Sequence, residues 1–211
     1  MPVKARPIAP AIYNWTGLYV GVDAGYLWSS VGYYVPGAPT AGTVPGKPNS
    51  FNFGGHIGYL YQFNNPFVIG AEADVSWLNG SSTEAFPGAP TQGAIAKTKW
   101  DASLRAILGY AFNTNLIYAT GGASWLNVEG CGVIIATAPT CVANTGYSNT
   151  RSGWTVGGGI AHAFTPNLSA RVEYLYANYG NFDFTATGAA GGIANVSMKT
   201  NKVRGGLSWK F

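Results

Sequence analysis

Eight stretches of the chain alternate between apolar and polar or small side chains with a period of two residues. They lie near residues 18–26, 52–62, 67–77, 100–110, 117–125, 154–164, 168–177 and 203–211. In residues 100–110, one face carries Trp100, Ala102, Leu104, Ala106, Leu108 and Tyr110, and the other carries Asp101, Ser103, Arg105 and Gly109. This period places successive side chains on opposite faces of a β-strand. The chain is therefore expected to be all-β.

Charged side chains inside these stretches all fall on the less apolar face. They are Asp23, Glu72, Asp74, Asp101, Arg105, Arg171, Glu173, Arg204 and Lys210. Only 9% of the 211 residues are charged, whereas a soluble domain has about 25%. The chain therefore has too few charges to coat a water-exposed surface, and 47% hydrophobic residues exclude a disordered chain. A net charge of +4 from scattered basic residues argues against nucleic-acid binding.

The connections between the stretches alternate between short and long. Each stretch has about ten residues, the length that a tilted strand needs to cross a bilayer. Short turns are expected at residues 64–66, 112–115 and 165–167, and long connections at 29–50, 79–98, 127–150 and 179–196. We predict an eight-stranded antiparallel transmembrane β-barrel, an up-and-down meander with short periplasmic turns and long extracellular loops.

A soluble lipocalin-like barrel would alternate in the same way, so the location of the aromatic residues matters. They gather near the strand ends of the apolar face: Tyr26, Tyr59, Tyr61, Trp77, Trp100, Tyr110, Trp125, Trp154, Tyr174, Tyr176 and Trp209. Such a distribution is typical of the two interfacial girdles of a membrane barrel. The membrane interpretation is favoured, and a soluble binder remains the alternative.

The first residues of the chain do not continue the pattern. Residues 1–14 contain three prolines, which predict an extended periplasmic tail. Residues 15–211 are expected to form the barrel domain. No run of 18 apolar residues that would form a transmembrane helix is present. Met1–Pro10 lacks the apolar core of a signal peptide. We expect that such a signal has been removed from this chain.

Both ends of the patterned region resemble a known family. The sequences Asn14-Trp15-Thr16-Gly17-Leu18-Tyr19-Val20-Gly21 and Val203-Arg204-Gly205-Gly206-Leu207-Ser208-Trp209-Lys210-Phe211 resemble the small outer-membrane β-barrel proteins of α-proteobacteria, the opacity-protein-like family of surface antigens. Residues 154–157 and 171–176 also resemble a hairpin of that family. The resemblance implies an eight-stranded barrel, periplasmic termini and no enzymatic activity. It also implies that the terminal aromatics Trp209 and Phe211 form the signal for the outer-membrane assembly machinery.

Several ionisable side chains of the inner face lie at similar heights along their strands. They are Asp23, His56, Glu72, Asp74, Arg105, Arg171, Glu173 and Arg204. An isolated buried ion costs several kcal/mol, so we expect Arg105 to meet Glu72, and Arg204 to meet Glu173 or Asp23. The cluster would either form a salt-bridge gate in a small channel or plug the lumen permanently with paired charges. A lumen of eight strands is just wide enough for side chains, which favours the permanently closed lumen.

The remaining reactive side chains indicate no catalytic, cofactor or metal site. Glu72 and Asp74 share a face, but without a cleft motif we favour ion pairing over acid–base chemistry. His56 and His162 fall on opposite faces without a third partner. Cys131 and Cys141 are the only cysteines, too few for a metal site. We expect them to form a loop disulfide in an oxidising compartment, with two unpaired thiols as the alternative.

We therefore expect a structural protein of the bacterial outer membrane that contributes to envelope integrity and presents surface loops. The alternatives are a small porin or lateral-diffusion channel for small solutes, and the soluble binder. The expected partners are outer-membrane lipid, lipopolysaccharide and the assembly machinery. Peptidoglycan contacts and lateral homo-oligomers are further options, and nucleic acid is not expected.

Overall fold

The computed structural model describes residues 13–34, 42–43, 49–86, 89–134, 146–185 and 193–211. The regular secondary structure of these residues consists of strands, and among them no helix is long and apolar enough to cross a membrane. The strands are β1 (Gly17–Tyr34), β2 (Gly42–Thr43), β3 (Ser50–Gln62), β4 (Phe67–Phe86), β5 (Ala89–Phe112), β6 (Asn115–Ile134), β7 (Tyr147–Ala163), β8 (Leu168–Thr185) and β9 (Ile193–Lys210).

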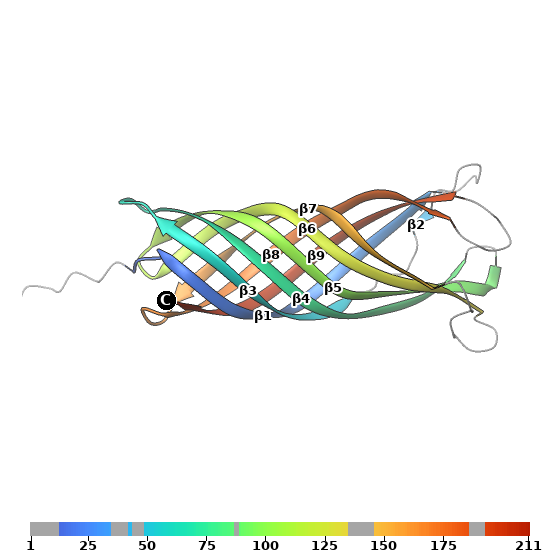
Figure 1. The fold of residues 1–211 in the computed structure, drawn as a ribbon, viewed down its shortest axis with the longest axis horizontal. Helices are drawn as coiled ribbons and strands as arrows, with labels where there is room; N and C mark the ends of the chain where they lie inside the picture. Colours follow the sequence, from blue (N-terminus) through green and yellow to red (C-terminus); the bar gives the residue numbers. More distant parts are fainter. Residues whose placement is uncertain (1–12, 35–41, 44–48, 87–88, 135–145, 186–192) are drawn as a thin grey trace, which may run out of the picture.

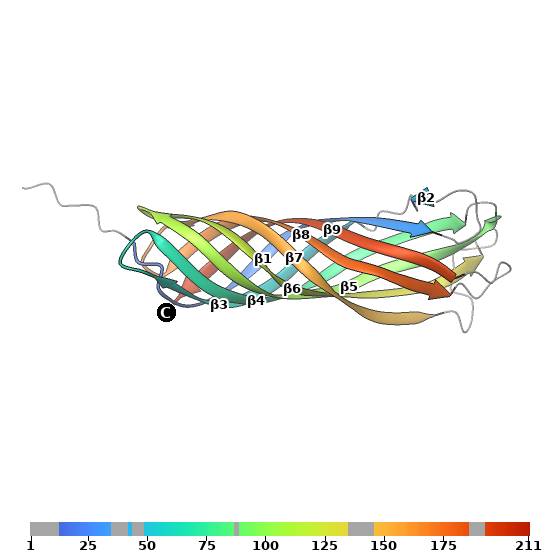
Figure 2. The same cartoon turned by 90° about the horizontal axis from the view of Figure 1, so that it is seen from above.

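The eight long strands form a closed antiparallel meander. Each long strand pairs with the next one along the chain, and β9 pairs with β1 to close the barrel (Figure 1). The short strand β2 adds to β1 beside Gly32 and Tyr33. The predicted eight-stranded barrel is confirmed. Both Figure 1 and Figure 2 show an elongated cylinder of tilted strands, with the C-terminus at the end that carries the short turns. We call this the turn end and the opposite one the loop end.

The strands at the loop end are longer than expected. β4 and β5 continue as a hairpin to Phe86 and Ala89, and β6 continues to Ile134, so much of the stretches 79–98 and 127–150 is strand rather than loop. Register shifts interrupt the pairing between Trp77 and Gly80 and between Thr98 and Trp100. A β-bulge inserts a residue and exchanges the two faces of a strand, which explains why the alternation is lost there.

The two faces of each strand lie where the charge pattern predicts. Leu104 and Val172 are 55% and 58% exposed on the outside of the barrel, whereas Glu72 and Arg105 are 1% exposed inside it. Apolar side chains therefore cover the outer surface, and the polar face lines the lumen.

The lumen contains three layers along the barrel axis. Buried hydrophobic side chains near the turn end form the turn-end apolar layer: Trp15, Tyr19, Leu60, Val68, Ile107, Ala111, Leu116, Tyr118, Ala161 and Ala163. A second group forms the loop-end apolar layer: Leu27, Leu78, Leu126, Ala177, Tyr179 and Met198. The predicted charged cluster lies between them. We call it the ionic layer, and it comprises Asp23, His56, Glu72, Asp74, Arg105, Arg171, Glu173 and Arg204.

Candidate functional site

The register of the sheet brings the ionic layer together from strands on all sides of the barrel. Glu72 on β4 lies directly opposite Arg105 on β5. Glu173 on β8 lies opposite Arg204 on β9. Since all members of the layer point inward and are at least nine-tenths buried, their side chains can meet across the lumen as well as along the sheet.

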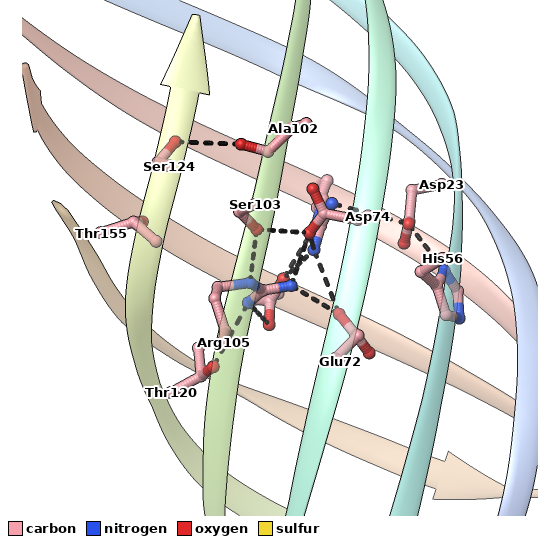
Figure 3. Close-up of polar contacts among 12 residues, drawn as sticks. Asp23, His56, Glu72, Asp74, Ala102, Ser103, Arg105, Thr120, Ser124 and Thr155 are labelled. Carbon is pink, nitrogen blue, oxygen red and sulfur yellow. Dashed lines mark hydrogen bonds and ion pairs between the residues drawn. The ribbon is translucent and has the colours of Figure 1, made fainter. Parts of the chain in front are cut away.

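Arg105 connects three carboxylates. Its Nη2 lies 2.5 Å from Glu72 Oε1 and 2.8 Å from Asp74 Oδ1 (Figure 3). Its Nη1 donates to Glu173 Oε1 at 2.9 Å. Its Nε donates to Ser103 Oγ at 2.9 Å. The expected pair of Arg105 with Glu72 is present, and the bond to Glu173 adds a connection across the lumen.

The other two arginines complete the network. Arg204 Nε donates to Glu173 Oε2 at 2.8 Å, and its Nη2 donates to Asp74 Oδ1 at 2.8 Å. Arg204 Nη1 also lies 3.6 Å from Asp23 Oδ2, so both expected partners of Arg204 lie beside it. Arg171 pairs with Asp23 at 3.1 Å and with Glu72. Three guanidinium groups thus link four carboxylates.

His56 belongs to the same network. Its Nδ1 is hydrogen-bonded to Asp23 Oδ2 at 2.7 Å, and its Nε2 to Ser208 Oγ at 2.8 Å. Figure 3 shows the His56 ring facing Asp23 beside Glu72 and Asp74. Both ring nitrogens are therefore occupied by protein partners. Among the residues that the structure describes, no group of His, Cys, Asp and Glu has the arrangement of a metal site.

Two tyrosines complete the layer from the turn end. Tyr19 OH donates to Glu72 Oε2 at 2.7 Å, and Tyr118 OH donates to Glu173 Oε1 at 3.2 Å. They belong to the turn-end apolar layer and offer only their hydroxyl groups to the carboxylates. The period-two alternation places Tyr19 on the face of Asp23 and Tyr118 on the face of Thr120, but the predicted cluster does not include these two tyrosines. A tyrosine at an inward position next to a buried carboxylate is the signal that could have identified them.

A second ion pair lies above the ionic layer, toward the loop end. Lys202 on β9 pairs with Asp101 on β5, and both are buried. These strands are not neighbours in the sheet, so the pair crosses the lumen. Lys202 was not singled out from the sequence because it precedes the stretch of clear alternation that begins at residue 203.

The residues before β1 close the turn end of the barrel. Trp15 is 4% exposed within the turn-end apolar layer, and its backbone N donates to Gln62 Oε1 at 2.9 Å. Tyr13 packs edge-on against Trp15 with ring centroids 4.7 Å apart, and its hydroxyl donates to Pro166 O at 3.2 Å. We call residues 13–16 the plug. Burial raises the pKa of the Tyr13 hydroxyl, which keeps this donor protonated.

The plug is also tied to the last strand. Lys210 Nζ lies 4.2 Å from the centre of the Tyr13 ring and donates to Asn14 O. Tyr13 and Asn14 thus pack on the barrel although both were expected in the tail. Residues 1–12 of that tail lie outside the described part of the chain.

The other predicted site residues lie outside the ionic layer. Trp209 and Phe211 are exposed on the outer surface at the turn end. Phe211 N donates to Leu18 O at 2.9 Å, beside the pairing of β1 with β9 that closes the barrel. Cys131 is buried on β6, but Cys141 lies outside the described residues. The disulfide therefore stays a prediction. His162 is exposed and hydrogen-bonded to Asn115 at 2.8 Å.

The charged side chains of the lumen are paired and lie between two apolar layers. In this narrow interior each arginine contacts at least two carboxylates, and apolar layers lie on both sides. Removing one partner of such a buried pair leaves an uncompensated charge, which costs about 3–5 kcal/mol. The network therefore resists opening.

Comparison with known proteins gives consistent matches over almost the whole chain. A family model described as "Outer membrane protein beta-barrel domain" matches residues 5–211. The chain is 29% identical to the 31 kDa outer-membrane immunogenic protein of Brucella melitensis, over 99% of this chain and 91% of that protein. It is 28% identical to the 22 kDa outer membrane protein of Rhizobium leguminosarum bv. viciae, over 99% and 83%.

A solved structure supports the fold. The outer membrane protein OprG from Pseudomonas aeruginosa superimposes with a TM-score of 0.55 over 94% of this chain and 98% of that chain. The two sequences are only 10% identical, so this likeness concerns the fold alone.

Proposed function

This chain belongs to the outer membrane protein β-barrel domain family, and we propose that it is a closed, non-catalytic structural barrel that contributes to envelope integrity. The protein is located in the bacterial outer membrane, like the relatives that it matches. In this role the barrel wall stabilises the lipid bilayer around it, and the lumen does not serve as a route for solutes.

The observation that carries the proposal is the ionic layer enclosed between the two apolar layers. Arg105 and Arg204 are 1% exposed, and each reaches carboxylates on more than one strand. Leu27 and Leu126, 1% and 0% exposed, lie on the loop-end side of this layer. An ion that crossed the lumen would have to separate buried ion pairs and pass an apolar layer on each side.

The outer surface supports the second half of the proposal, the contact with the envelope. Exposed apolar side chains such as Leu104, Leu108 and Ile160 cover the outside of the strands, and outer-membrane lipid and lipopolysaccharide are the partners that fit them. The exposed aromatic side chains of Trp209 and Phe211 lie on the same surface and suit a signal for the assembly machinery. The strands and connections of the loop end would be presented outside the cell, as the word "immunogenic" in the names of the Brucella relatives suggests.

Electrical recording from planar bilayers tests the closed barrel. Purified protein should give no steady conductance at a membrane potential at which a large porin, added as a positive control, conducts. A persistent open channel would contradict the proposal and favour a small porin. If proteoliposomes took up apolar solutes and liposomes without the protein did not, the result would favour a lateral-diffusion channel instead.

Fractionation tests the soluble binder. The protein is expected in the outer-membrane fraction and should need detergent to remain in solution. A lipocalin-like binder would need a charged exterior and an apolar interior, and the barrel has the opposite arrangement. Oligomers that resist detergent on gels would support lateral self-association of the barrel. Crosslinks between the protein and the cell wall would support contacts with peptidoglycan.

A further inference from the structure

Three side chains on neighbouring strands form a hydrogen-bonded chain from a carboxylate through a histidine to a serine. Asp23 Oδ2 lies 2.7 Å from His56 Nδ1, and His56 Nε2 lies 2.8 Å from Ser208 Oγ. All three residues are buried, and Ser208 extends the chain from the ionic layer toward the turn end. The same order of groups activates a serine nucleophile on several unrelated folds, where it is recognised by geometry and not by sequence position.

The sheet register brings the three residues together because a glycine lies between them. Gly21 on β1 is directly opposite His56 on β3 and also directly opposite Ser208 on β9. A Cβ atom at Gly21 would lie 2.4 Å from His56 Nε2, so a side chain there would occupy the space of the imidazole ring. Because Gly21 has none, His56 reaches across β1 to Ser208. Asp23 lies two residues further along β1 and meets the other ring nitrogen.

The contacts of Asp23 determine which ring nitrogen of His56 carries the proton. Asp23 pairs with Arg171 at 3.1 Å and lies 3.6 Å from Arg204 Nη1, so it acts as a carboxylate, which only accepts hydrogen bonds. His56 Nδ1 therefore donates to Asp23. In the neutral ring Nε2 is then the acceptor for the Ser208 hydroxyl group. A base in this position takes the proton when the serine oxygen attacks.

A cavity lies beside Ser208 on the turn-end side. It has a volume of about 40 Å³, and its lining extends from Ser208 and Arg171 to the partly exposed Tyr13 and Lys210. About 10–15 Å³ holds one water molecule, so about three non-hydrogen atoms fit inside, as many as an acetyl group has. Trp15 Nε1 belongs to the same lining and has no hydrogen-bond partner in the described part of the chain. This buried donor is available to the oxygen of an acyl group.

We propose that Ser208 is an acylation site that accepts one acetyl-sized group from an activated ester. Ser208 Oγ attacks the carbonyl carbon, and its proton passes to His56 Nε2. A bond forms between Oγ and the acyl carbon, the bond from that carbon to the ester oxygen breaks, and the alcohol leaves with the proton from His56. The acyl group then fills the cavity, so no water molecule fits beside the new ester. The reaction therefore stops at one group per chain, and the barrel remains non-catalytic.

Acetylation of the full chain in lipid bilayers by p-nitrophenyl acetate tests the proposal, with Ser169 as the internal control. Ser169 lines the same cavity and lies directly opposite Ser208 in the sheet, but His56 Nε2 is bonded to Ser208. Peptide mass spectrometry should find at least tenfold more acetyl groups on Ser208 than on Ser169. Equal labelling of the two serines, or labelling of neither even after Trp15→Ala enlarges the cavity, would overturn the proposal.

His56→Gln separates activation of Ser208 from access to it. Glutamine can hydrogen-bond to both neighbours but cannot take the proton, so acetylation of Ser208 should be at least tenfold slower than in the wild type. The exposed Lys199 should react at the wild-type rate in both chains. An unchanged rate at Ser208 would refute the role of His56 as a base. If this variant does not fold, the wild-type ratio of Ser208 to Ser169 decides alone.

Release of p-nitrophenol tests the limit of one group per chain. The release that depends on Ser208, measured as the difference between the wild type and Ser208→Ala, should end at one equivalent. Continued release would show turnover, and it would contradict both the single acylation and the non-catalytic role. Absence of acylation would leave the structural role intact, because that role is tested by conductance.

Discussion

Arg105 on β5 and Glu173 on β8 are joined across the lumen by a hydrogen bond of 2.9 Å, although two strands separate them around one side of the barrel and four around the other. The same guanidinium group also contacts Glu72 on the neighbouring strand. One side chain thus ties opposite walls of the barrel together.

Arg105→Met should therefore destabilise the barrel strongly. The substitution keeps much of the side-chain volume but leaves the carboxylates of Glu72, Asp74 and Glu173 with too few buried cations. The expected loss in the free energy of unfolding is about 3–5 kcal/mol, measured by urea unfolding in detergent micelles or bilayers.

Lys99→Met is the matched control for that experiment. Lys99 pairs with Glu129 at 3.4 Å, but both side chains are largely exposed, and such a pair contributes about 0–1 kcal/mol. Equal losses in the two variants would show that burial of the Arg105 network does not matter for stability.

Gly21→Ala tests how tightly the ionic layer is packed. A Cβ atom at Gly21 would lie 2.2 Å from Leu207 O and 2.4 Å from the His56 ring, so His56 would have to leave Asp23. Overpacking of this kind costs about 1–3 kcal/mol, and urea unfolding measures it.

The control for Gly21 lies on the neighbouring strand. Gly55 is on the opposite face, and its added Cβ would meet nothing closer than Gly21 O at 3.4 Å. Gly55→Ala should therefore leave the unfolding midpoint within error of the wild type. If Gly21→Ala behaved like Gly55→Ala, His56 would not be fixed by the packing described above.

The alternation of the sequence was sufficient to predict the barrel, the orientation of its faces and the pair of Arg105 with Glu72. That pair lies on adjacent strands, so strand order and height are enough to place it. The bond from Arg105 to Glu173 could not be predicted in this way, because contacts across the lumen depend on the tilt and stagger of the whole barrel.

Two other features were missed for local reasons. Trp15 precedes the first strand, where no periodic pattern exists to show that its side chain turns into the lumen. The loop-end parts of β4 and β5 follow register shifts near Trp77 and Thr98. A pattern read with a fixed period of two ends at such a bulge, although the strand continues.

The plug is expected to control access to the turn end of the lumen. Ala161 is buried beside Trp15 in the turn-end apolar layer, so Ala161→Cys should react slowly with a water-soluble thiol reagent once Cys131 and Cys141 are replaced by serine. Adding Trp15→Ala should accelerate the reaction at least tenfold because it removes the covering side chain.

Trp209→Ala serves as the control for the plug. Trp209 is also at the turn end but is 51% exposed on the outer surface, so its removal should not change the reactivity of Ala161→Cys. Acceleration by both substitutions would indicate general loosening of the barrel, and acceleration by neither would show that Trp15 is not the barrier.

The orientation of the barrel wall leads to the last prediction, which compares one substitution at two heights. Leu104 faces outward between the inward residues Ser103 and Arg105, at the level of the ionic layer, whereas Ser152 faces outward two residues beyond Trp154 toward the loop end. An arginine on the lipid face of a barrel costs about 2–4 kcal/mol at the middle of the bilayer and about 0–1 kcal/mol near its edges. Leu104→Arg should therefore lower the free energy of unfolding in bilayers by the larger amount and Ser152→Arg by the smaller one. Equal costs at the two positions would mean that the apolar side of the strands does not face hydrocarbon, and the membrane assignment of this surface would then be wrong.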